Sequence, residues 1–130
     1  MAVRKARGSN TRKLRPLKSS ASFTSFVLDQ LADLGDVTAR AMFGGVGLYC
    51  DGLFFGLIAR DEVYLKVDDS NRGDFEGVGS RPFKPYADRA GTMQYYAVPV
   101  AILESSLELA AWARKSVLVA AKAGSRPRSR

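Results

Sequence analysis

The sequence predicts an α+β domain, a two-layer sandwich in which helices cover an antiparallel sheet. Three observations predict this fold class. The chain has 130 residues, 46% of them apolar and 25% charged, which is the balance of one compact core. Short β-rich runs broken by turn residues fill the stretch from residue 37 to residue 67. Apolar residues at helical spacing precede and follow that stretch.

The first element is a helix. It starts at Ser22, carries five apolar residues on one face, and ends before Gly35, which acts as its C-terminal cap. These apolar residues are Phe23, Phe26, Val27, Leu31 and Leu34.

Four strands are expected next, at residues 37–42, 47–50, 53–59 and 63–67. Asp51-Gly52 predicts a two-residue type I′ turn, because Asp and Gly tolerate a positive φ. The 53–59 run holds no polar side chain, which indicates a central strand with both faces covered, or with one face on a partner. For that reason a homodimer is expected.

The second half alternates short helices and strands. Residues 68–77 fit a short helix anchored by Phe75, and residues 82–86 fit an edge strand, since proline cannot donate to an interior ladder. Residues 92–98 resume as a strand, and Pro99 begins a helical turn.

The last helix has a defined start. Ser105 and Glu108 form a capping box, so the helix begins near Ser106. Its Trp112 face is expected on the sheet, and it ends near Gly124.

Lysine and arginine concentrate at the two ends. Residues 1–18 carry seven and residues 114–130 carry six, with no acid in either segment, whereas all thirteen acids lie in between. The chain is therefore an acidic body with basic ends. We expect a flexible basic arm at residues 1–21, a folded domain at 22–123 and a basic tail at 124–130.

The basic ends are the candidate nucleic-acid contacts, since their field attracts phosphates. Neither end holds an aromatic residue for base stacking, so contact would be phosphate-directed and salt-sensitive. Two alternatives stay open: the ends keep the protein in solution, or they bind its own acidic body. The candidate residues are Arg4, Lys5, Arg7, Arg12, Lys13, Arg15, Lys18, Arg126, Arg128 and Arg130.

Catalytic, metal and cofactor sites find little support. The chain has no histidine, which excludes Ser-His and Cys-His catalysis, and its one cysteine, Cys50, is expected to be inert. The glycines of residues 43–47 lack the Lys and Ser/Thr of a phosphate-binding loop and predict a turn or bulge. Asp68 and Asp69 fit no metal motif and are interpreted as solvated acids. We expect no catalytic residue, no metal and no cofactor.

Four tyrosines lie in or beside the expected strands, and they are candidates for an aromatic surface on the sheet. Strand alternation assigns at least half of them to core packing. They are Tyr64, Tyr86, Tyr95 and Tyr96.

A cytoplasmic protein is expected. The sequence has no apolar run long enough to span a membrane and no apolar block of a secretory signal. The first 20 residues are Arg-rich and acid-free, a composition that also fits a mitochondrial transit peptide.

Several short motifs follow one another in order along the chain. They are Leu34-Gly35, Met42-Phe43-Gly44-Gly45, Gly47-Leu48-Tyr49, Asp51-Gly52, Val63-Tyr64-Leu65-Lys66-Val67, Tyr95-Tyr96-Ala97-Val98-Pro99 and the helix around Trp112. As a set they resemble the N-terminal domain of the TfoX/Sxy competence regulators, over residues 23 to about 122. The resemblance implies a bacterial cytosolic protein with a fold similar to secretion chaperones and with no catalytic residues.

The longer members of that family act in transcriptional control of DNA uptake, as coactivators beside a DNA-bound regulator. The resemblance therefore implies a non-enzymatic regulatory module whose partner is a transcription regulator. The match leaves no room for the second domain of the longer members, so a stand-alone domain is expected. The alternative function is electrostatic, sequence-independent binding of nucleic acid through the basic termini. An enzyme based on acids, tyrosine or lysine is a third class, and it would need a pocket joining several polar groups.

Overall fold

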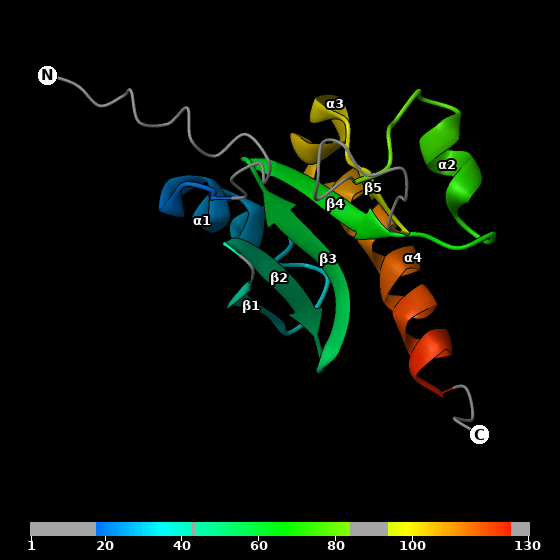
Figure 1. The fold of residues 1–130 in the computed structure, drawn as a ribbon, viewed down its shortest axis with the longest axis horizontal. Helices are drawn as coiled ribbons and strands as arrows, with labels where there is room; N and C mark the ends of the chain where they lie inside the picture. The colour runs from blue at the N-terminus through cyan, green and yellow to red at the C-terminus, as the bar shows by residue number, and fades with distance from the viewer. Residues whose placement is uncertain (1–17, 43, 84–93, 126–130) are drawn as a thin grey trace, which may run out of the picture.

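The computed structural model describes residues 18–42, 44–83 and 94–125 (Figure 1). Its centre is a five-stranded antiparallel sheet whose strands follow one another in chain order. The strands are β1 (Val37–Met42), β2 (Gly45–Cys50), β3 (Leu53–Ala59), β4 (Glu62–Lys66) and β5 (Tyr95–Ala97). The helices are α1 (Ala21–Gln30), α2 (Arg72–Glu76), α3 (Val100–Leu103) and α4 (Ser106–Ser125). The predicted α+β fold class is confirmed.

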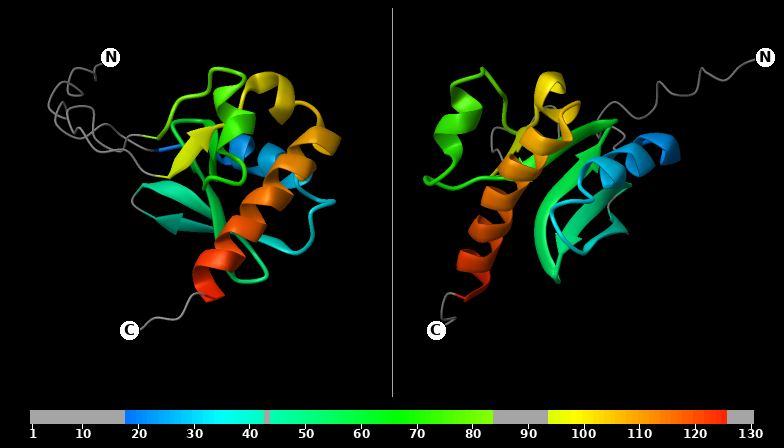
Figure 2. Two further views of the ribbon diagram at one scale, coloured as in Figure 1. Left: turned by 90° about the vertical axis from the view of Figure 1, so that its right-hand side faces the viewer. Right: turned by 180° about the vertical axis from the view of Figure 1, so that it is seen from behind.

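Helices α1 and α4 cover one face of the sheet. Val27 of α1 and Leu109 of α4 belong to the same buried cluster as Phe55 and Ile58 of β3. Seen from behind, α1 and α4 lie in front of the strands, with α4 as the longest element (Figure 2). This helix-covered face holds the main core.

The opposite face of the sheet has a second, smaller core, in which Leu57 and Ala59 of β3 pack with Tyr64 and Tyr95. A β-bulge interrupts the pairing of β2 with β3: Tyr49 pairs with Phe54 and Leu48 with Gly56, so Phe55 is an extra residue and the alternation of faces along β3 shifts there. β3 is thus a central strand with both faces covered, as predicted. Because this cover exists in a single chain, the reason for expecting a homodimer on this strand is removed.

Two tight turns shape the hairpins around β3. Asp51 and Gly52 have φ values of 52° and 83°, which confirms the predicted turn. Arg60 and Asp61 adopt φ values of 53° and 58° without any glycine. The backbone of a residue other than glycine is strained at such φ values, so this conformation persists only where other contacts hold it. Here Ser19 and Ser20 supply those contacts through hydrogen bonds to Asp61.

The predicted limits of the first helix were wrong at both ends. The N-cap is Ser20 rather than Ser22, since the Ser20 hydroxyl accepts from the Phe23 amide at 3.1 Å. The helix ends at Gln30, because beyond it the amides of Ala32 and Leu34 bond to carbonyls three residues back. This tighter turn keeps Leu31 buried, so apolar spacing alone does not reveal it.

Two elements after β4, the short helix α2 and the strand β5, are shorter than predicted. β5 has three residues, and Pro82, at the start of the predicted edge strand, forms an isolated bridge to Tyr96. Residues 84–93, which include parts of both predicted strands, lie outside the described residues. The glycine-rich connection between β1 and β2 is a turn, as predicted, with Gly44 at φ 83°.

The start of α4 corrects the capping box. The Ser105 hydroxyl accepts from the Glu108 amide at 3.2 Å, but the Ser105 amide donates to the carbonyl of Ile102 at 3.1 Å. Only one half of the box therefore forms, and the Glu108 carboxylate is not used as a cap. The helix continues to Ser125, close to the predicted end. Among the described residues, no helix is long and apolar enough to cross a membrane.

Candidate functional site

Of the predicted nucleic-acid contacts, the structure describes Lys18 alone, and its side chain is exposed. Arg4, Lys5, Arg7, Arg12, Lys13, Arg15, Arg126, Arg128 and Arg130 lie outside the described residues. The structure does show where both basic ends leave the body.

The N-terminal segment is attached at the β3–β4 turn. The Ser19 hydroxyl accepts from the Asp61 amide at 2.9 Å, and the Ser20 amide donates to Asp61 Oδ1 at 2.8 Å. These bonds hold the strained turn and fix residue 18 beside it. The C-terminal tail leaves from the far end of α4, on the other side of the body (Figure 1). The two sets of charges therefore start from separate places.

Acids of the body pair with several of its cations. Lys115 Nζ lies 2.8 Å from Asp74 Oδ2, and Lys122 Nζ lies 3.5 Å from Asp68 Oδ2. Both lysines lie on α4 within the folded body, so these pairs do not test the predicted alternative that the basic tails bind the acidic body. Arg72 pairs with Asp69 in the same way.

Three further cations lie over aromatic rings. Arg40 is 5.3 Å from the centre of the Tyr49 ring, Lys66 is 5.1 Å from that of Tyr95, and Arg60 is 5.8 Å from that of Phe83. A cation that is held over an aromatic ring is less available to bind a phosphate group. Within the described body, six cations are thus engaged by acids or rings.

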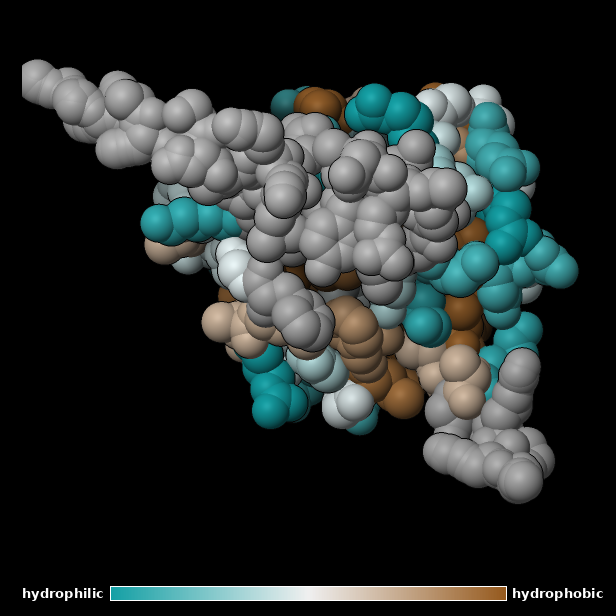
Figure 3. Space-filling view, viewed as in Figure 1, coloured by the Kyte–Doolittle hydropathy of each residue, from teal (hydrophilic) through white to brown (hydrophobic). Residues whose placement is uncertain are grey.

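The rings form two contacting groups, Tyr49–Phe54–Tyr95 and Tyr64–Phe83, on the second face of the sheet, which we call the aromatic face. Ring centres are 5.2 Å apart for Tyr49 and Phe54, 5.6 Å for Phe54 and Tyr95, and 4.8 Å for Tyr64 and Phe83. Seen from this side, brown and tan residues lie among hydrophilic ones over β2 and β3 (Figure 3). Its members are Tyr49, Phe54, Tyr64, Phe83 and Tyr95.

The predicted tyrosine surface is only partly present. Tyr64 and Tyr95 lie on the aromatic face, but Tyr96 lies on the other face against Phe75, with ring centres 5.9 Å apart. Tyr86 is outside the described residues. Tyr64 and Tyr95 are buried, as the core interpretation requires, so they do not form an open platform for base stacking.

The sequence prediction missed Tyr49, Phe54 and Phe83. A signal for two of them was present, because the Asp51-Gly52 turn places Tyr49 opposite Phe54. Phe83 reaches the face through the short bridge region, where its amide donates to the Tyr95 carbonyl at 2.7 Å. No local pattern reveals that contact.

The buried phenols and the thiol are poor catalysts. Burial, together with the Tyr64 hydroxyl's 2.7 Å bond to Glu62, raises the pKa of Tyr64 to about 12. Burial and the neighbouring Tyr49 raise the pKa of Tyr95 to about 12. Burial, with Asp51 and Asp36, also raises the pKa of the Cys50 thiol. All three groups stay protonated at neutral pH, which agrees with an inert cysteine and disfavours a general base here.

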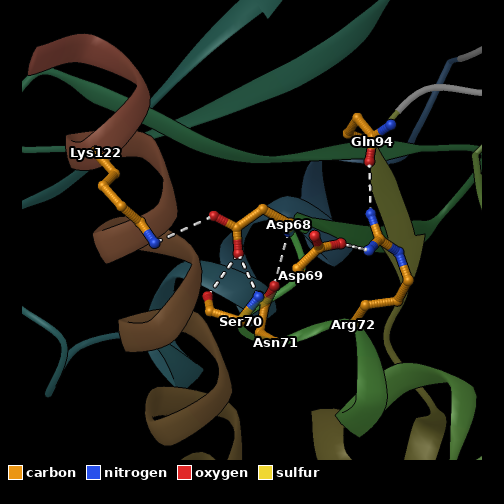
Figure 4. A network of polar contacts seen from close by, with 7 residues as sticks. All are labelled: Asp68, Asp69, Ser70, Asn71, Arg72, Gln94 and Lys122. Carbon is orange, nitrogen blue, oxygen red and sulfur yellow. Dashed lines mark hydrogen bonds and ion pairs between the residues drawn. The ribbon is translucent and has the colours of Figure 1, made fainter. Parts of the chain in front are cut away.

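The acids after β4 have a structural role, which corrects the interpretation of Asp68 as merely solvated (Figure 4). Asp68 Oδ1 accepts from the Ser70 amide at 2.8 Å and from its hydroxyl at 2.5 Å. Asn71 is 2% exposed, accepts from the Asp68 amide at 2.9 Å and donates to the Lys66 carbonyl at 3.1 Å. The buried Ser116 hydroxyl of α4 donates to the same carbonyl at 2.8 Å.

This network joins the end of β4 to α4 rather than holding a ligand. Arg72 donates to Gln94 at 3.1 Å, which adds the approach to β5 (Figure 4). The described part of the chain contains no group of three or more acidic or cysteine side chains placed to bind a metal ion.

Comparison with known protein families matches residues 29–120 to the TfoX N-terminal domain. A comparison with curated proteins found no match. The matched residues run from the last turn of α1 through the sheet to the final turns of α4, so they include the core of both faces.

Proposed function

The chain belongs to the TfoX N-terminal domain family, a regulatory and non-catalytic family, and we propose that it acts as an adaptor in transcriptional control in the cytoplasm. The folded body binds a protein partner, a transcription regulator. The basic ends hold DNA close to that complex through phosphate contacts.

One observation supports the assignment of DNA contact to the basic ends and of partner binding to the folded body. Six cations of the body are engaged internally, three by Asp68, Asp69 and Asp74 and three by rings of the aromatic face, whereas acid is absent from residues 1–18. Phosphate contact therefore falls to the ends, and the more acidic body is left for protein contact.

The test is fluorescence anisotropy of a duplex DNA over a salt series. We expect the full chain to bind, with an affinity that falls steeply with salt, by a log–log slope of about 0.9 per contacted phosphate. Neutralising Arg126, Arg128 and Arg130 to Gln reduces the slope. Neutralising the same number of body cations, Arg72, Lys115 and Lys122, leaves it nearly unchanged because these residues are already paired.

The opposite result would refute the assignment. If the body variant loses as much slope as the tail variant, DNA lies on the body. If the full chain does not bind DNA even at low salt, the DNA part of the proposal fails. The partner part is then tested by itself. Transcription regulators captured by the full chain should still be captured when the ten end cations are neutralised. Loss of capture with the neutralised ends would favour the alternative of a purely electrostatic nucleic-acid binder.

A further inference from the structure

Helix α4 exposes apolar side chains on the face that points away from the sheet. Leu107 is 80% exposed and Leu118 is 63% exposed, and Ala111 and Arg114 between them are exposed as well. The other side of the helix is buried against the sheet through Leu109 and its neighbours. We call the exposed row Leu107, Ala111, Arg114 and Leu118 the α4 ridge.

The ridge has the spacing of a helix–helix seam. Its members are separated by four, three and four residues, which keeps them in one line along the helix. A surface helix normally carries polar residues on this face, and here Leu107 and Leu118 place an apolar side chain at each end of the ridge.

The ridge is complementary to itself when reversed. In an antiparallel pair of helices, Leu107 meets the partner's Leu118, and Ala111 meets the partner's Arg114. The leucines then bury one another at both ends of the seam. The small Ala111 leaves room for the aliphatic stem of the arginine, whose charged end reaches water. A surface that matches its own copy in this way is what a two-fold symmetric interface requires.

Charges beside the ridge select the same orientation. Glu108 and Lys115 lie on one flank, seven residues apart, and the Glu108 carboxylate is free of the capping role. In the antiparallel pair, Glu108 faces the partner's Lys115, and the symmetric contact repeats at the other end. In a parallel pair the Glu108 flanks of the two copies lie on opposite sides of the seam, so Glu108 does not meet the partner's Lys115. Lys115 bonds Asp74, but its side chain is 54% exposed and has room for a second carboxylate.

We propose that α4 is a self-association surface through which two copies of this chain pair in antiparallel fashion along the α4 ridge. The contact spans about three helical turns, less than a standard stable interface, so the dimer forms in a concentration-dependent way. This goes beyond the adaptor function and does not depend on DNA or on a transcription regulator.

Sedimentation velocity of the full chain over a concentration series tests the proposal. We expect a shift from monomer to twice the monomer mass as concentration rises, and Leu118→Glu should abolish the shift. Val78→Glu is the matched control, because Val78 is 53% exposed but lies in the turn after α2. Circular dichroism verifies that both variants fold. A wild-type chain that stays monomeric throughout overturns the proposal, and so does a Leu118→Glu chain that dimerises like wild type.

A charge swap tests the orientation. Glu108→Lys and Lys115→Glu each place like charges across the seam and should weaken self-association. An equimolar mixture of the two variants restores opposite charges at both contacts, so it should associate about tenfold more tightly than either variant alone. If the mixture is no tighter than its components, the antiparallel register is wrong.

Discussion

Strand β3 contributes side chains to both faces of the sheet, and the two faces are covered by different kinds of side chain. On the helix-covered face, Leu48, Phe55 and Ile58 are fully buried against α1 and α4. On the aromatic face, Phe54 and Tyr95 pack ring against ring, and Lys66 lies over the Tyr95 ring. Adjacent residues of one strand thus enter two unlike cores.

Because the two cores differ in chemistry, they should affect the free energy of unfolding and its pH dependence differently. Aliphatic side chains contribute by the area that they remove from water, which does not depend on pH. Rings with hydroxyl groups and neighbouring cations add polar contacts that change when a proton is lost. We therefore expect the helix-covered face to dominate the free energy of unfolding and the aromatic face to set its dependence on alkaline pH.

The largest effect should come from truncating one ring on each face. Phe55→Ala removes a fully buried ring from the helix-covered face and should lower the free energy of unfolding by about 3–5 kcal/mol. Phe54→Ala removes the adjacent, half-buried ring and should cost about half as much, since the cavity is open to water. Urea unfolding measures both. Equal costs would contradict the division between the faces.

The sequence was sufficient for the first four strands because its signals there were local. Asp51-Gly52 specifies its turn by the φ values that it tolerates, and the apolar 53–59 run specifies a covered central strand. It was insufficient where distant segments decide the structure. Arg60 and Asp61 form a tight turn without glycine, held by Ser19 and Ser20 from about forty residues away.

The candidate site shows the same limit. Counting charges located the basic ends, but not that Lys115 and Lys122 pair with acids of the body. Alternation suggested that some tyrosines pack, but the bulge in β3 decides which rings share a face. A bulge inserts one residue and reverses the alternation after it, so period-two counting fails beyond that point.

The aromatic face should affect the free energy of unfolding at alkaline pH. Tyr95 has a pKa of about 12 in the folded protein against an ordinary value of 10.0, so the folded state keeps a proton that the unfolded chain releases. The free energy of unfolding is therefore full below about pH 10 and falls as pH rises toward 12. Tyr95→Phe should lose less stability between these values than wild type does. Urea midpoints over this range measure it, and an unchanged slope would argue against a buried phenol.

The smallest effect on stability should appear at acid pH. It concerns Asp68, whose network joins the end of β4 to α4. Hydrogen bonds from Ser70, with a contribution from Lys122, hold the pKa of Asp68 below its ordinary value of 3.8. Its contribution to stability is thus present above 3.8 and is lost as pH falls through the lower folded value. Asp68→Asn should be less stable than wild type near neutral pH, and the gap should close on acidification. Asp69→Asn is the control, because the Asp69 side chain is 99% exposed and should change stability by no more than about 0.5 kcal/mol. A gap for Asp68→Asn that stays constant with pH would show that the carboxylate charge contributes nothing to this junction, and that the turn is held by the shape of the side chain alone.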